Sequence, residues 1–99
     1  MMTGDKVSAA DAEKMGMIYK IFADDSFEAE SKKIVETLAQ MPTKGLAYTK
    51  FALNQSFFNH WDEQLSMEDQ YQQKAARTED YKEGINSFLE KRAPNFKGK

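Results

Sequence analysis

Residues 78–99 read TEDYKEGINSFLEKRAPNFKGK, and this stretch encodes a helix together with both of its ends. Thr78 is a suitable N-cap, and the two acids after it suit the positive end of the helix dipole. Four apolar residues then recur at helical spacing and predict one apolar face: Tyr81, Ile85, Phe88 and Leu89. We expect Lys91 and Arg92 to close the last turn and Pro94 to prevent continuation.

Upstream of this stretch, the sequence predicts four more helices. A brief helix is capped by Ser8 and by Gly16, a second begins at residues 24–26, and a third begins at Pro42. The fourth, about residues 61–77, is the least amphipathic. The six-residue apolar run at 17–22 has no strand partner, so we interpret it as an extended connector or as half of a strand pairing whose other half is absent. The predicted fold class is all-α, with about five helices in a single domain over residues 1–99.

The composition excludes several functional classes. A net charge of −2 on 99 residues argues against a nucleic-acid binder, which usually carries a strong positive balance. The lack of cysteine excludes disulfides, thiol catalysis and cysteine-based metal sites. No apolar run approaches the ~20 residues that a membrane span needs, and the first residues do not resemble a secretory signal. We therefore expect a cytoplasmic protein that binds neither nucleic acid nor membrane.

No residue pattern identifies a catalytic centre or a metal site. His60 is the only histidine, and at a helix junction a capping or surface role is the simpler interpretation. The pairs Asp24–Asp25 and Glu79–Asp80 resemble catalytic carboxylates, but both lie at expected helix starts, where the dipole favours acids. Phosphate-binding glycine loops and the ligand spacings of zinc and calcium sites are absent from the sequence.

The basic tail offers one candidate binding site, in which cations lie close in sequence to aromatic residues: Lys91, Arg92, Lys97 and Lys99 beside Phe88 and Phe96. A cation beside an aromatic ring can hold a phosphorylated, ring-bearing ligand such as a nucleotide. From composition alone, a solvated helix end is the simpler interpretation, because helix C-termini attract basic residues. Gly84 costs about 1 kcal/mol relative to alanine inside a helix, which predicts the close approach of another backbone.

Three blocks of the sequence resemble the enoyl-CoA hydratase/isomerase (crotonase) superfamily, in the order in which the family has them. The first runs from Thr3-Gly4 through Val7-Ser8-Ala9 to Gly16-Met17 and is similar to the family's TG…SA..A…GL segment. The second, residues 41–54, resembles its MP..AL..TK.ALN helix. The tail resembles its closing D..EG..AFLEKR.P.F signature, and residues 61–77 look nearest to the phenylacetate-degradation isomerase branch.

The resemblance implies a C-terminal helical fragment of a crotonase-type fold that lacks the β-spiral core. Family members are more than twice as long, and their oxyanion-hole amides and acidic catalytic residues precede this region, so Met1 is expected at an internal family position and the catalytic N-terminal domain is expected to be absent. In the family, this region packs subunits into trimers and dimers of trimers. By the same resemblance, Phe88 falls at the aromatic beside the adenine of CoA and Lys91 at the lysine near a CoA phosphate.

Three hypotheses follow from these observations. The leading one is the C-terminal domain of an enoyl-CoA hydratase or isomerase, serving subunit assembly and the CoA nucleotide edge of a neighbouring active site; the CoA thioester is then the substrate of the parent enzyme, not a bound cofactor. The alternatives are a self-standing helical module that oligomerises without catalysis, and a small CoA-binding bundle. We expect the isolated chain to be inactive, because the oxyanion donors are missing, and to oligomerise or be marginally folded, because apolar surface would be exposed.

Overall fold

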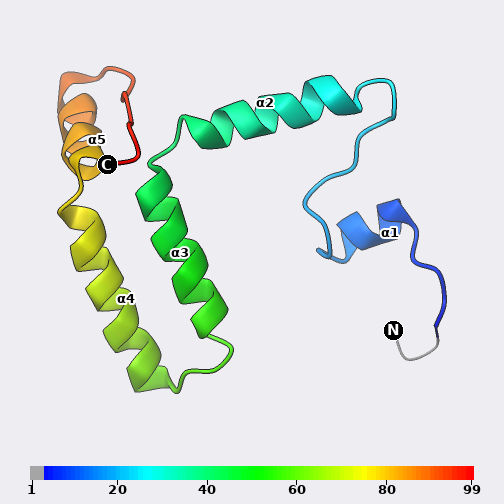
Figure 1. The fold of residues 1–99 in the computed structure, drawn as a ribbon, viewed down its shortest axis with the longest axis horizontal. Coiled ribbons are helices and arrows are strands. Elements are labelled where there is room, and N and C mark those ends of the chain that lie inside the picture. The colour runs from blue at the N-terminus through cyan, green and yellow to red at the C-terminus, as the bar shows by residue number, and fades with distance from the viewer. Residues whose placement is uncertain (1–3) are drawn as a thin grey trace. The chain divides into compact units, whose positions relative to one another are not determined.

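The structure, a computed structural model, describes residues 4–99, and within them it is entirely helical (Figure 1). Its elements are α1 (Ala9–Lys14), α2 (Phe27–Ala39), α3 (Thr43–Gln55), α4 (Trp61–Ala76) and α5 (Glu79–Glu90). The predicted all-α class with five helices is confirmed. The expectations that concern Met1 and Thr3 fall outside the described residues. The chain divides inside α2 into two compact units, Met1–Val35 and Glu36–Lys99.

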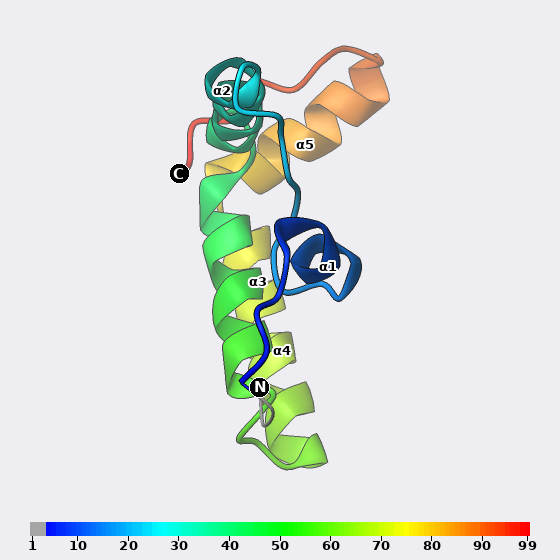
Figure 2. The same ribbon diagram turned by 90° about the vertical axis from the view of Figure 1, so that its right-hand side faces the viewer.

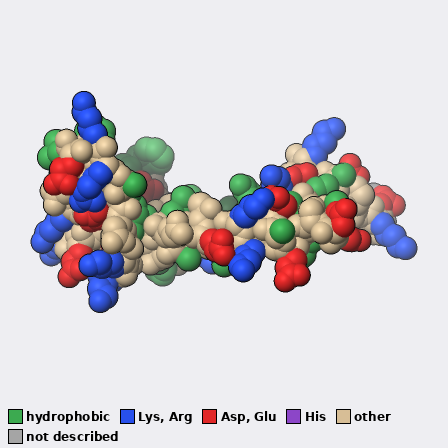
Figure 3. All heavy atoms as spheres, turned by 90° about the horizontal axis from the view of Figure 1, so that it is seen from above, with side chains coloured by type: hydrophobic (Ala, Val, Ile, Leu, Met, Phe, Trp, Pro, Cys, Tyr) green, Lys and Arg blue, Asp and Glu red, His purple; other side chains and the backbone are tan. Residues whose placement is uncertain are grey.

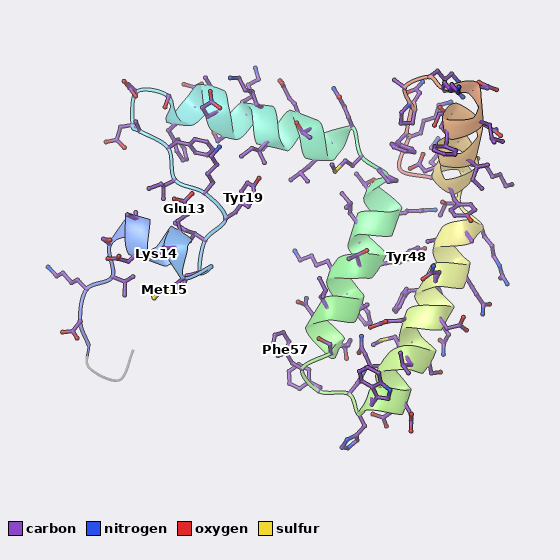
Figure 4. All side chains as sticks on the ribbon, turned by 180° about the vertical axis from the view of Figure 1, so that it is seen from behind. Glu13, Lys14, Met15, Tyr19, Tyr48 and Phe57 are labelled. Carbon is purple, nitrogen blue, oxygen red and sulfur yellow. The ribbon has the colours of Figure 1, made fainter. Side chains whose placement is uncertain are left out.

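In the first unit, α1 begins at the cap that the sequence indicates. The Ser8 hydroxyl accepts a hydrogen bond from the Asp11 backbone N–H at 3.1 Å and donates one to the Asp11 carboxylate at 2.6 Å. Gly16 follows the helix with φ 75°, a left-handed conformation that glycine adopts without steric cost. Residues 17–22 form neither helix nor strand, which agrees with the connector interpretation, and Tyr19 within them is exposed (Figure 4).

The second unit is built on an antiparallel hairpin of α3 and α4 (Figures 1 and 2). Aromatic side chains join the two helices, because the Tyr71 ring of α4 lies 5.3 Å, centroid to centroid, from both Tyr48 and Phe51 of α3. Tyr48 lies in the space between the helices (Figure 4). The Gln64 side-chain amide also donates to the Ala52 carbonyl at 3.2 Å. These contacts hold the hairpin that α5 follows.

The turn of this hairpin carries the only histidine of the chain. His60 is the N-cap of α4, and its backbone N–H donates to the Glu63 carboxylate at 3.0 Å. The bond uses the backbone of His60, not its imidazole. The predicted capping role at this junction is therefore confirmed, with Glu63 as the acceptor.

Among the described residues, no hydrophobic side chain is buried, and only Asp80 and Ser87, each 3% exposed, count as buried at all. Large apolar side chains lie on the surface instead, as the green spheres of Figure 3 show for the face in view. At the α3–α4 turn, Phe57, Phe58 and Trp61 are all exposed, and Trp61 reaches 76%. No helix in residues 4–99 is long and apolar enough to cross a bilayer.

Candidate functional site

The start of α5 is fixed by a side-chain cap. Thr78 has an extended backbone, and its hydroxyl accepts a hydrogen bond from the Tyr81 backbone N–H at 3.1 Å. The same hydroxyl donates to the Ala75 carbonyl, in the last turn of α4, at 2.7 Å. One threonine thus ends α4 and begins α5. The capping role predicted for Thr78 is confirmed.

The end of α5 differs from the prediction. The helix stops at Glu90, and Lys91 takes a left-handed conformation with φ 52°. The Lys91 N–H then donates to the Phe88 carbonyl at 3.3 Å, and the Arg92 N–H donates to the Ser87 carbonyl at 3.0 Å. These two bonds form a Schellman motif, which reverses the chain. The expectation that Lys91 and Arg92 close the last turn is wrong, because both residues lie beyond it.

The residues after this reversal return along α5 and are held at its first turn by Asp80. The Asp80 carboxylate accepts the backbone N–H of Lys97 at 2.7 Å and that of Gly98 at 2.8 Å. The Asp80 N–H in turn donates to the Lys99 carbonyl at 3.1 Å. Figure 1 shows the red C-terminal segment beside α5. The acid that the sequence places at a helix start is a buried anchor for the tail.

A second acid, one turn further along α5, holds the start of the returning segment. The Arg92 guanidinium bonds both oxygens of the Glu83 carboxylate, at 2.6 and 2.9 Å, and the Asn95 N–H donates to the same carboxylate at 2.8 Å. Hydrogen bonds from Arg92, and then from Asn95, lower the pKa of Glu83 to about 2. The Glu83 and Glu90 carboxylates raise the pKa of Arg92.

Because of these contacts, the two basic residues that follow the helix differ in whether their charge is paired. Arg92 is bonded to Glu83 and Glu90. Lys91, in contrast, is exposed, and its ammonium has no ion-pair partner among residues 4–99. Of the two adjacent cations, only Lys91 is available to an external anion.

An open apolar groove of about 490 Å³ runs along the other side of this helix. Its walls come from α5, from the start of α3, from Ala75 near the end of α4, and from the Phe96 ring of the returning segment. Phe88 lines this groove and is 82% exposed. Its position places an exposed aromatic ring one helical turn before the free lysine. The backbones of the sequence-predicted residues Phe88 and Lys91 therefore meet at one end of α5, where the Lys91 N–H donates to the Phe88 carbonyl.

Gly84 lines the same groove, and the partner predicted for it is wrong. Among residues 4–99, no backbone atom outside the helix lies within 4 Å of the place that a β-carbon would take, which is 3.7 Å from the Phe96 Cε1 atom and 4.0 Å from Cζ. The neighbour is thus an aromatic ring at ordinary van der Waals distance. The tail that Asp80 and Glu83 hold in place carries this ring.

The remaining candidates do not form a chemical centre. The acidic pair Asp24–Asp25 lies in the turn before α2. In the pair Glu79–Asp80, the Asp80 carboxylate is occupied by hydrogen bonds from the tail. Within residues 4–99, no group of three or more His, Cys, Asp or Glu side chains is arranged to hold a metal ion. The feature with the clearest binding geometry is the α5 end, where Phe88 and Lys91 lie.

Comparison with known proteins gives consistent matches along the whole chain. The family model described as enoyl-CoA hydratase/isomerase matches residues 1–99. The 1,2-epoxyphenylacetyl-CoA isomerase of Escherichia coli (strain K12) is 39% identical over 98 residues, which cover 99% of this chain and 37% of that protein. The trans-2-decenoyl-(acyl-carrier-protein) isomerase of Streptococcus mutans serotype c is 32% identical, with coverage of 99% and 37%.

Solved structures match in the same way. An enoyl-CoA hydratase from Geobacillus kaustophilus HTA426 superposes with a TM-score of 0.89 at 28% identity, covering 99% of this chain and 37% of that one. The chain therefore spans a little over a third of the length of the relatives that it matches.

Proposed function

Because this chain belongs to the enoyl-CoA hydratase/isomerase family, we propose that it is the C-terminal region of an enzyme that acts on acyl-CoA thioesters. Its role there is twofold. The apolar helix faces serve subunit assembly, and the end of α5 forms the CoA nucleotide edge of a neighbouring active site. The observation that carries the second role is an exposed Phe88 followed one turn later by Lys91, whose ammonium has no ion-pair partner among the described residues.

The chemistry of this pair suits the nucleotide end of CoA. The exposed Phe88 ring offers a flat surface on which adenine can stack, next to an apolar groove. A lysine ammonium is a point charge that binds phosphate oxygens through charge-assisted hydrogen bonds. Since Arg92 is bonded to two carboxylates, we assign the phosphate contact to Lys91 alone.

The test is calorimetric titration of the purified chain with CoA and with dephospho-CoA, which lacks the 3′-phosphate. We expect Lys91→Ala to weaken CoA binding by about tenfold, as expected for losing a charge-assisted bond. Phe88→Ala is expected to weaken both ligands alike, because adenine is common to them. Lys82→Ala removes a lysine from α5 away from the groove and is the matched control. Equal CoA affinity in the Lys91→Ala and Lys82→Ala variants would refute the assignment.

The acyl group of the substrate can be carried by CoA or by an acyl carrier protein, and we propose CoA. One relative is an isomerase of an acyl-carrier-protein thioester, and such a carrier presents phosphopantetheine without the adenosine part of CoA. Dependence of affinity on the 3′-phosphate would favour CoA. Equal binding of CoA and 4′-phosphopantetheine would instead favour a protein carrier.

Catalysis by the chain alone is not part of the proposal. Oxyanion stabilisation is usually the largest catalytic contribution, and we place its donors in the part of the enzyme that this chain does not span. Assays with crotonyl-CoA and a 3-enoyl-CoA are therefore expected to show no turnover, and measurable turnover would overturn the assignment as a non-catalytic region.

A second candidate function is a helical module that oligomerises without binding CoA. The exposed aromatic residues of the α3–α4 turn favour it. Tight self-association together with undetectable CoA affinity in the titration above would select this candidate over the first.

A further inference from the structure

Lys91 has a backbone conformation that a lysine does not favour. Within residues 4–99 it is the only residue other than glycine with a positive φ, at 52°. The left-handed position of a Schellman motif is usually glycine, because a β-carbon there crowds the following carbonyl. Lys91 therefore requires contacts elsewhere that keep the reversal in place.

The contact that usually supports such a reversal is missing. In most Schellman motifs, the residue after the left-handed one makes a hydrophobic contact with the last turn of the helix. Here that residue is Arg92, and the residue to which its N–H donates is Ser87, so neither side chain is suited to an apolar contact. A polar interaction takes its place.

That interaction is the bidentate ion pair of Arg92 with Glu83. Both guanidinium–carboxylate distances are below 3.0 Å, and the Glu83 side chain is only 23% exposed. The Asn95 N–H adds a third bond to the same carboxylate from the far side of the reversal. Two residues that follow Lys91, Arg92 and Asn95, are thus fixed to one side chain of α5, the helix that precedes it. Planar two-point pairing restricts geometry more than a single ion pair does.

We propose that Glu83 and Arg92 are positioning residues for the CoA edge formed by Phe88 and Lys91. They fix the backbone reversal from which the Lys91 side chain extends, so that the position of its Cα and Cβ atoms is set before a phosphate arrives. The Glu83 carboxylate also pairs with Arg92, which leaves Lys91 as the one of these two adjacent cations with no ion-pair partner among residues 4–99. This inference rests on the proposed function.

The Glu83→Gln variant separates positioning from simple electrostatics, because the two predict opposite signs. If only net charge matters, removing an acid and freeing Arg92 strengthens the binding of a polyanion. If Glu83 positions Lys91, the backbone reversal at Lys91 is flexible in the variant. CoA binding must then order this reversal, which weakens CoA affinity by about two- to tenfold. Glu79→Gln removes the same charge from the first turn of α5 without touching Arg92, and is the matched control.

The experiment titrates the purified chain and its variants with CoA, and follows Lys91 by NMR. In the titration, we expect weaker CoA binding for Glu83→Gln and unchanged or tighter CoA binding for Glu79→Gln. In the NMR spectra, we expect the scalar coupling and the chemical shifts that report the positive φ of Lys91 to be lost in Glu83→Gln only. Arg92→Lys keeps the charge but loses the second bond, and is expected to fall between the unmodified chain and Glu83→Gln. Far-ultraviolet circular dichroism checks that each variant retains its helices.

The two proposals fail in different ways. If Lys91→Ala weakens CoA binding but Glu83→Gln does not, the CoA edge stands and the positioning role is overturned. If Lys91 keeps its left-handed backbone in Glu83→Gln, the positioning role is overturned whatever the affinity. If the unmodified chain has no CoA affinity, the proposed function fails and the positioning role fails with it.

Discussion

Three glycines of the second unit differ in the space that a β-carbon would find at their positions. A β-carbon at Gly45 meets nothing within 4 Å, one at Gly84 meets the Phe96 ring at 3.7 Å, and one at Gly98 would lie 2.5 Å from the Thr43 hydroxyl oxygen. Gly98 also has φ 70°, which side chains rarely adopt. The same substitution should therefore have opposite effects at these positions.

We expect Gly84→Ala to stabilise the chain by about 0.5–1 kcal/mol, because alanine is the better helix former and its methyl group fits beside Phe96. Gly45→Ala should give a similar gain. Gly98→Ala should destabilise the tail, by about 1–2 kcal/mol for the left-handed conformation alone. Urea unfolding followed by circular dichroism measures all three. A loss of stability in Gly84→Ala would show that the ring cannot accommodate a methyl group.

At Glu83, the shifted pKa predicts a dependence of stability on pH. Its folded value of about 2 lies below the ordinary value of 4.5, so the charged form stabilises the folded state. That contribution is complete above pH 4.5 and is lost as the pH falls toward 2. We expect Glu83→Gln to flatten the slope of unfolding free energy over this range, whereas Glu79→Gln leaves it in place. Parallel slopes for all three proteins would contradict the ion pair.

At the scale of elements, two helix caps expected from the sequence act through different atoms. Thr78 caps α5 with its side chain, whereas His60 contributes a backbone N–H to the capping of α4. We therefore expect Thr78→Ala to cost about 1 kcal/mol and Thr78→Ser much less. His60→Ala should cost less than Thr78→Ala, because its N–H remains. Chemical denaturation checks this order, and an equal cost at both sites would assign a structural role to the imidazole.

The elements also show what sequence can and cannot predict here. Helix starts at Ser8 and Thr78 follow from local capping rules, and the five helices follow from apolar periodicity. The return of the tail does not, because Asp80 meets its partners 17 and 18 residues away, beyond the few residues over which capping rules act. The left-handed Lys91 was missed for a related reason: basic residues at a helix end are ordinarily taken as part of its last turn.

For the whole molecule, the resemblance to the enoyl-CoA hydratase/isomerase family is confirmed. The described helices leave large apolar side chains exposed. With no buried hydrophobic side chain among residues 4–99, the helices lack the burial that normally offsets chain entropy. The chain spans a little over a third of its relatives, which is consistent with partners outside it.

We therefore expect the isolated chain to self-associate or to unfold at low concentration. The single tryptophan, Trp61, reports on this because it is 76% exposed in the chain alone. Its emission should shift to shorter wavelength as concentration rises, in step with the mass measured by light scattering. A monomer with a sharp, cooperative melt and constant emission would contradict this expectation.

The carboxylate of Asp80 also bears on the order in which the chain folds. Its bonds to the Lys97 and Gly98 N–H groups close a ring of α5 and the tail that requires no residue before Asp80. Closing so short a loop costs little entropy, and local contacts form faster than distant ones. This ring can thus assemble without the α3–α4 hairpin. A peptide of residues 78–99 is then expected to retain helical structure, which Asp80→Asn would reduce.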